Sequence, residues 1–241
     1  MAAQKQARSN CEMRAQNRHI VIAIDGPAAS GKSSVARELA GRLGFVCVNS
    51  GAMYRAVTWD ILRRGIDPGD HARIDNYLES ARIVCDLQNN ESHILINDID
   101  PAQHLRDDNV NNSVSLVSSV PRVRQVLVEK MRHYARDYDL VIEGRDIGSV
   151  VFPDTPFKFY IDALPDVRLR RRAAEDQRDE IATRDRADSS RVASPLVIAK
   201  DAEVIDTSNL SIKGVVSEIA ARLETKGLRV AGPPKAGQPL L

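Results

Sequence analysis

The sequence predicts an α/β fold, with a parallel sheet flanked by helices, from two observations. Continuous apolar runs such as residues 20–25 and 157–161 suit strands that are buried on both faces, as parallel strands are. Between such runs lie segments whose apolar residues recur every three or four positions, which is typical of helices packed on a sheet. The 241 residues, 43% of them hydrophobic, suffice for one large domain or for a core domain with an insert.

The first elements follow the order strand, glycine-rich turn, helix. Residues 20–25 form the first predicted strand, and apolar residues four apart give residues 32–43 one buried stripe. A short strand over residues 46–48 and a helix over residues 52–64 follow, with Gly65 as the expected helix stop. This alternation is the start of a parallel α/β sheet.

The pattern changes beyond the second helix. Residues 83–87 and 93–96 are strand-like runs joined by a polar stretch, which indicates an antiparallel hairpin inserted into the alternating chain. A further helix is predicted to begin near Pro121, with Ser118 or Ser119 as its N-cap.

The rest of the chain returns to the first pattern. Strands are predicted over residues 140–143, 157–161 and 204–206, and a closing helix over residues 212–223. The predicted parts are a mobile N-terminal extension (1–19), a first core segment (20–64), the insert (65–138), a second core segment (139–164), an arginine-rich segment (165–192), a third core segment (193–226) and a disordered tail (227–241).

Charge and cysteine content narrow the functional classes. Lys and Arg number 34 against 33 Asp and Glu, so the net charge of +1 does not argue for nucleic acid or membrane, and neither is expected as a partner. Cys11, Cys47 and Cys85 include no C-x-x-C pair, which argues against a disulfide framework or a cysteine zinc site. Free thiols suit a reducing compartment, and no signal peptide or membrane span is predicted. We therefore expect a cytoplasmic protein, and we expect a monomer.

The most informative motif lies between the first strand and the first helix. Residues 26–33 match G-x-x-x-x-G-K-[ST], a loop whose backbone N–H groups and following helix N-terminus converge on phosphate oxygens. Lys32 would place a positive charge on the β- and γ-phosphates, and Ser33 would offer its hydroxyl to Mg²⁺. The predicted triphosphate site comprises Gly26, Pro27, Ala28, Ala29, Ser30, Gly31, Lys32, Ser33 and Ser34.

A second group of polar residues follows other strands at the same predicted sheet edge. Residues 49–55 and 143–146 both come directly after strands, where the ligands of open α/β sheets bind. Arg184, Asp188 and Arg191 are spaced to share one helix face, although a solvated Arg184–Asp188 ion pair is the alternative explanation. The chain contains no N-K-x-D segment, which a GTPase would need to read its base.

Together these segments resemble the bacterial cytidylate (CMP/dCMP) kinase family from about residue 20 to residue 223. The matching segments are residues 26–34, 49–55, 121–124, 144–154, 184–191 and 194–196. The resemblance implies a P-loop nucleoside monophosphate kinase fold with an inserted monophosphate-binding subdomain, which carries a small antiparallel sheet, and a short lid. It also implies transfer of the γ-phosphoryl group of ATP to CMP or dCMP, giving CDP or dCDP and ADP.

The resemblance assigns roles at the acceptor site. Ser115, Arg124 and Asp146 match positions that read cytosine, whose exocyclic amine suits a carboxylate and whose ring acceptors suit Arg and a hydroxyl. Uracil inverts that edge pattern and would leave buried polar groups unpaired. The implied CMP site comprises Ser50 and Tyr54 in the pocket wall, Arg55, Arg145 and Arg191 on the phosphate, Arg184 and Asp188 on the ribose, and Ser115, Arg124 and Asp146 on the base.

The implied chemistry needs no general base, because the acceptor oxygen of CMP is already anionic near neutral pH. Catalysis then rests on positioning and on charge neutralisation, with Mg²⁺ as the cofactor. Arg171 is the candidate that a lid would bring to ATP. The implied catalytic residues are Lys32, Arg145, Arg184 and Arg191.

Two alternative functions stay open. The same loop could serve a kinase of another small acceptor, such as UMP or AMP. A protein of a different class would only sense ATP without catalysis, although clustered arginines for a second phosphate argue against it.

Three features depart from the family pattern. Asn49 stands where the family usually has Asp, and Glu143 replaces the commoner Asp before Gly144. The stretch 172–184 is also shorter than in typical members, so we expect the lid to close less tightly over ATP.

Overall fold

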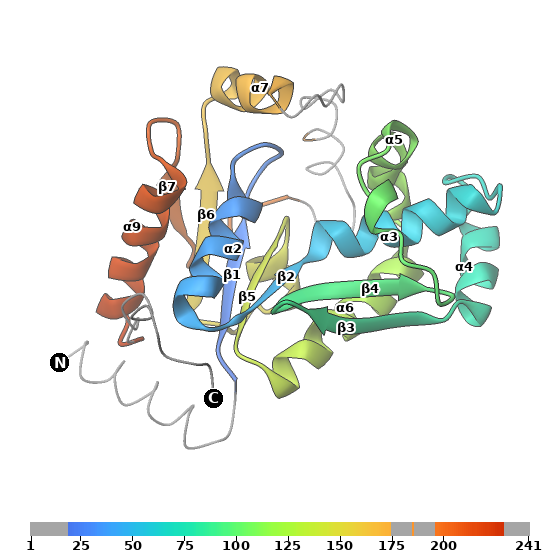
Figure 1. Cartoon of the computed structure of the whole chain (residues 1–241), viewed down its shortest axis with the longest axis horizontal. Helices are drawn as coiled ribbons and strands as arrows, with labels where there is room; N and C mark the ends of the chain where they lie inside the picture. Colours follow the sequence, from blue (N-terminus) through green and yellow to red (C-terminus); the bar gives the residue numbers. More distant parts are fainter. Residues whose placement is uncertain (1–18, 175–184, 186–195, 229–241) are drawn as a thin grey trace.

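The computed structural model describes residues 19–174, 185 and 196–228, which form one seven-stranded sheet with helices on both faces (Figure 1). The strands are β1 (Val21–Asp25), β2 (Val46–Asn49), β3 (Ile83–Gln88), β4 (Glu91–Ile96), β5 (Leu140–Gly144), β6 (Phe157–Asp162) and β7 (Glu203–Asp206). Their order is β3-β4-β2-β5-β1-β6-β7, and every neighbouring pair except β3 and β4 is parallel. The predicted α/β fold is confirmed.

The helices alternate with these strands. They are α2 (Lys32–Leu43), α3 (Ser50–Arg63), α4 (His71–Ser80), η1 (Ala102–His104), α5 (Asp108–Val117), α6 (Pro121–Asp137), η2 (Ile147–Val151), α7 (Pro165–Ala173) and α9 (Ile212–Thr225). Within the described part of the chain, no helix combines the length and the apolar character that crossing a membrane requires.

The sheet separates two hydrophobic cores. On β1, Val21 and Ala23 face the core shared with α3 and α6, whereas Ile22 and Ile24 face the core shared with α2 and α9. All five residues of β1 are buried. Burial on both faces explains why the central strands are continuous apolar runs and do not alternate with polar residues.

The parallel register brings the strand ends to one edge. Asp25 of β1 lies opposite Gly144 of β5 and Tyr160 of β6, and Asn49 of β2 lies opposite Glu143. The segments that follow β1, β2 and β5 therefore leave the sheet side by side. In Figure 1, α7 lies beyond the same end of β6.

The predicted hairpin is present but does not form a separate sheet. β3 and β4 pair antiparallel through a turn in which Asn89 and Asn90 have φ values of 53° and 62°. β4 also extends the main sheet, because Cys47 of β2 pairs with Glu91 and donates its N–H to the Asn90 carbonyl at 2.9 Å. An unpaired β2 edge would expose backbone groups, and the hairpin covers them.

The predicted N-cap of α6 was wrong. Val120 occupies that position in an extended conformation, as a residue before proline prefers, and no side chain caps the helix. Ser118 donates its hydroxyl to the Ser115 carbonyl at 3.1 Å, and Ser119 donates to the Leu116 carbonyl at 2.6 Å. Pro121 needs no cap for its own nitrogen, because it has no N–H.

Asp60 joins α3 to the insert. Its side chain is fully buried and accepts hydrogen bonds from Arg63, from Arg64, from the Tyr77 hydroxyl at 2.7 Å and from the Asn97 amide at 3.0 Å. Burial alone would raise the pKa of Asp60, but the donors from Arg64, Tyr77 and Arg63 outweigh it and hold the pKa below its usual range.

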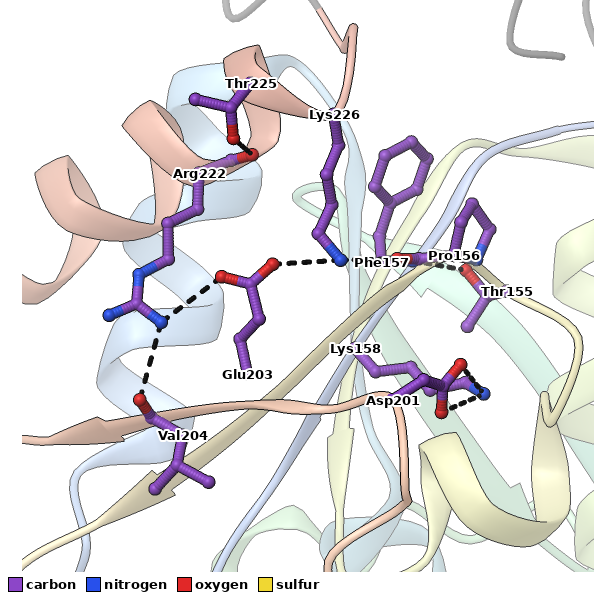
Figure 2. A network of polar contacts seen from close by, with 10 residues as sticks. All are labelled: Thr155, Pro156, Phe157, Lys158, Asp201, Glu203, Val204, Arg222, Thr225 and Lys226. Atoms are coloured by element: carbon purple, nitrogen blue, oxygen red, sulfur yellow. Dashed lines mark hydrogen bonds and ion pairs between the residues drawn. The ribbon is translucent and has the colours of Figure 1, made fainter. Parts of the chain in front are cut away.

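A separate polar network fastens α9 to the amino ends of β6 and β7 (Figure 2). Glu203 accepts from Arg222 at 3.2 Å and from Lys226 at 2.9 Å. Lys158, only 4% exposed, donates to both carboxylate oxygens of Asp201 at 2.9 and 2.8 Å. This network stabilises the sheet at the amino ends of β6 and β7.

Asp60→Asn is expected to lower the free energy of unfolding at pH 7 by about 2 to 4 kcal/mol, because the amide cannot satisfy the same cationic donors. A depressed pKa gives stability above the unfolded-state value of 3.8, and this stability is lost as the pH falls through the native pKa. Urea unfolding should therefore show a difference that shrinks below about pH 4.

The matched control is Asp98→Asn, since Asp98 pairs with Arg82 on the exposed surface. It should change stability by less than about 0.5 kcal/mol. Equal losses in the two variants would contradict a structural role for the Asp60 cluster.

Candidate active site

The phosphate loop, residues 26–33, connects β1 to α2. Gly31 is the N-cap of α2 with φ 93°, a conformation that favours glycine, and no side chain caps the helix. The first N–H groups of α2 are therefore available to an anion at the positive end of the helix dipole.

Gly26 is required by close packing between the loop and β6. A Cβ at this position would lie 2.1 Å from the Ile161 carbonyl oxygen, which leaves no room for a side chain. The Gly26 carbonyl accepts a hydrogen bond from the Arg145 guanidinium. The loop is thus held by β6 on one side and by the segment after β5 on the other.

Lys32 and Ser33 begin α2 directly after the glycine-rich part of the loop. Lys32 is only 8% exposed, and its ammonium donates to the Pro27 carbonyl at 3.0 Å, so it points back into the loop. The Ser33 hydroxyl donates to the buried Glu143 carboxylate at 2.7 Å. A hydroxyl and a carboxylate are both oxygen ligands of the kind that Mg²⁺ takes, so the two residues fit the predicted metal.

Arg171 reaches the phosphate loop from α7. Its guanidinium donates to the Ser30 carbonyl at 3.0 Å, to the Thr207 hydroxyl at 3.1 Å and to the Thr207 carbonyl at 2.7 Å. The structure therefore places Arg171 beside the predicted ATP site. Thr207 was missed, although its position directly after β7 was an available signal.

Arg168 and Asp185 also contact the loop and were not predicted as site residues. The Asp185 carboxylate accepts the Ala28 N–H at 3.0 Å, and Arg168 donates to the Ala28 carbonyl at 3.2 Å and to Asp185. In the sequence, Arg168 is part of the arginine-rich segment (165–192) and nothing more. It lies 140 residues from Ala28 along the chain, so the sequence gives no sign that the two residues are in contact.

Arg124 and Asp146 form a buried ion pair. The two side chains are 7% and 6% exposed, and the guanidinium donates to the carboxylate. The Arg124 guanidinium also lies 5.7 Å from the centre of the Tyr54 ring, a cation–π contact, and donates to the Ser118 carbonyl at 3.4 Å. The structure therefore brings Arg124 and Asp146 together. Ser115 is linked to Ser118 only through its backbone carbonyl, which accepts the Ser118 hydroxyl, and a base-reading role of its side chain stays a prediction.

Arg55, the predicted phosphate ligand on α3, is held by a residue that the sequence did not reveal. Its guanidinium donates to the Asn111 amide oxygen at 3.3 Å. Asn111, on α5, is 3% exposed and donates to the Arg106 carbonyl at 2.8 Å. The insert therefore orients Arg55 through Asn111.

Ser50 and Asn49 shape the start of α3. The Ser50 hydroxyl donates to the Glu143 carbonyl at 2.7 Å, which ties the helix to β5. Asn49 is the N-cap of α3 and accepts the Ala52 N–H at 2.8 Å. Asparagine at position 49, where the family usually has aspartate, therefore still caps the helix, because Asn and Asp side chains both accept this hydrogen bond well.

Three predicted site residues fall outside the described part of the chain. They are Arg184, Asp188 and Arg191. Their places, and the expected short lid, stay predictions. The predicted extension (1–19) and tail (227–241) also lie outside the described part, apart from residues 19, 227 and 228, of which Leu228 is 5% exposed and packs in the core shared with α2 and α9.

A glycine-lined phosphate loop at the carboxyl edge of a parallel sheet, facing a second group of arginines, defines a P-loop nucleotide kinase. Residues 22–225 match the model of the cytidylate kinase family. The chain belongs to this family.

Curated relatives agree with the match. The chain is 39% identical to a cytidylate kinase of Clostridium botulinum over 84% of this chain and 97% of that protein. It is 42% identical to the cytidylate kinase of Pelotomaculum thermopropionicum, covering 84% and 95%. It is 41% identical to that of Caldanaerobacter subterraneus, covering 88% and 98%.

Gly26→Ala is expected to weaken ATP binding by at least about tenfold, because the methyl group would displace the loop from β6. Gly41→Ala is the control: it lies in α2, and a Cβ there meets nothing within 4 Å. That variant should keep its ATP affinity and gain up to about 1 kcal/mol of stability. Calorimetric titration with ATP measures the affinities, and normal binding by Gly26→Ala would contradict the packing argument.

Proposed function

We propose that the protein transfers the γ-phosphoryl group of ATP to CMP or dCMP, giving CDP or dCDP and ADP. The observation that carries this proposal is the buried Arg124–Asp146 pair beside the Tyr54 ring, at the same sheet edge as the phosphate loop. Membership of the cytidylate kinase family supports the same reaction.

The buried pair suits cytosine better than uracil. The Asp146 carboxylate accepts hydrogen bonds only, so it matches the exocyclic amine of cytosine, and Arg124 donates to ring acceptors. Uracil presents a carbonyl where cytosine has its amine. A buried carboxylate facing that carbonyl would lose its partner and be repelled, which costs far more than a missing methyl group.

The phosphates would meet at Arg145. This residue follows β5, contacts the phosphate loop through the Gly26 carbonyl, and precedes Asp146 directly. Lys32 would neutralise the donor phosphates, and Arg55 from α3 would hold the acceptor phosphate beside Arg145. The chain from residue 65 to 138 then serves as the CMP-binding insert, because it supplies Ser115, Arg124 and the Asn111 support for Arg55.

ATP would bind with Mg²⁺, and Ser33 and Glu143 are the residues that would hold the ion or its waters. When bound, the ion neutralises charge on the donor phosphates. Ser33 and Glu143 orient one another through their hydrogen bond.

We also propose that the protein works in the cytoplasm as a monomer. Two observations support the compartment. Cys47 and Cys85 are free thiols, and net charge gives no attraction to membranes or nucleic acids.

A coupled assay of ADP release tests the reaction with CMP, dCMP, UMP and AMP as acceptors. We expect kcat/KM for CMP or dCMP to exceed that for UMP and AMP by at least about a hundredfold, because the wrong base leaves Asp146 unpaired. Equal rates with UMP and CMP would refute the base-reading assignment. No turnover with any acceptor would favour a protein that only senses ATP.

Asp146→Asn is expected to lower kcat/KM for CMP about a hundredfold, equivalent to about 2.7 kcal/mol, because the amide is neutral and leaves Arg124 without its counter-charge. ATP affinity should stay within about twofold of the wild type, since the change lies outside the phosphate loop. Asp154→Asn, at an exposed position on the surface after η2, is the matched control and should behave as wild type. Loss of ATP binding by Asp146→Asn would show that Asp146 does not act on the acceptor side.

A further inference from the structure

Asp25, the last residue of β1, holds the turn that follows β5. Its carboxylate is 5% exposed. One oxygen accepts the Ile147 N–H and the other accepts the Gly148 N–H, both at 2.8 Å. These two residues come directly after Arg145 and Asp146, so a single carboxylate fixes the backbone beside both predicted CMP ligands.

The neighbouring residue provides a second attachment. Gly26 follows Asp25 and accepts the Arg145 guanidinium on its carbonyl. The Asp25–Gly26 dipeptide therefore holds the turn through two backbone N–H groups and through the side chain of Arg145. The same dipeptide begins the phosphate loop, so donor and acceptor sites are attached to one another at this point.

The turn is also packed tightly from the other side. A Cβ at Gly148 would lie 3.2 Å from the Lys158 side chain and 3.4 Å from the Asp25 carboxylate. Lys158 is itself held by Asp201 (Figure 2). Gly148 thus sits between Asp25 and Lys158 with little room to move.

A charged carboxylate is costly at this position, because burial removes it from water. Burial raises the pKa of Asp25 from 3.8 to about 6, although the Gly148 and Ile147 N–H groups act in the opposite direction. A side chain that only filled space would avoid this cost by being apolar. The carboxylate is needed here because it accepts hydrogen bonds from two backbone N–H groups of the turn, those of Ile147 and Gly148.

We propose that Asp25 is a positioning residue that fixes the Arg145–Asp146 turn against the phosphate loop. It sets the distance between the acceptor and donor phosphates and the orientation of the base-reading carboxylate. The inference rests on the proposed transfer of phosphate to CMP. Asp25 itself touches neither substrate in this account.

The test is Asp25→Asn. An amide offers one acceptor oxygen, and its NH₂ group would face one of the two N–H donors, so one attachment is lost and the turn loosens. We expect KM for CMP to rise at least about tenfold and the preference for CMP over UMP to fall at least about fivefold. ATP affinity, measured by calorimetry, should stay within about twofold.

The control is Asp70→Asn. Asp70 is the N-cap of α4 and also accepts a backbone N–H, from Arg73 at 3.0 Å, but it lies on the insert away from the turn. Asparagine caps helices as well as aspartate does, so this variant should keep wild-type constants. If Asp25→Asn fails to fold, Gly148→Ala is the second test. Its methyl group would press on the Asp25 carboxylate and on Lys158, and so disturb the hydrogen bonds that hold the turn. We expect this variant to have a raised KM for CMP and an unchanged affinity for ATP.

The outcomes separate the two levels of the argument. Wild-type protein without CMP turnover overturns the proposed function and this inference with it. Wild-type turnover combined with unchanged KM and base preference in Asp25→Asn, or in Gly148→Ala where that variant decides, overturns the inference alone. A loss of ATP affinity equal to the loss for CMP also overturns it, because Asp25 would then support only the phosphate loop.

Discussion

The parallel pairing of β1 with β5 is the constraint on which the rest of the site depends. Asp25 lies opposite Gly144, so the phosphate loop and the turn with Arg145 and Asp146 leave the sheet side by side. An antiparallel pairing would send these segments to opposite edges. Two hydrophobic cores, one on each face of the sheet, hold this register in place.

Around that edge, charged side chains are held by protein oxygen atoms. Lys32 contacts the Pro27 carbonyl, Arg171 contacts Ser30, and Arg124 contacts Asp146. Buried charges need such partners, because desolvation would otherwise make them too costly. The result is a preorganised set of cations, which is what phosphoryl transfer requires of a protein. A net charge of +1 gives no hint of this local concentration.

Local signals in the sequence predicted most of the fold. The helix over residues 32–43 has the predicted bounds, because strand, glycine turn and apolar stripe all lie within one segment. The prediction of a serine N-cap for α6 was wrong, because Pro121 at the first helical position makes the residue before it, Val120, the extended N-cap. Contacts such as Arg55 with Asn111, or Ala28 with Asp185, depend on packing between distant segments. Neither composition nor spacing can reveal them.

A crystal structure with CMP and a non-hydrolysable ATP analogue tests the central claim most directly. The account predicts that the cytosine amine lies within hydrogen-bond distance of the Asp146 carboxylate, with Arg124 on the ring acceptors. It also predicts the CMP phosphate on Arg55 and Arg145, facing the triphosphate in the loop. A cytosine bound elsewhere, with no contact to Arg124 or Asp146, would contradict it.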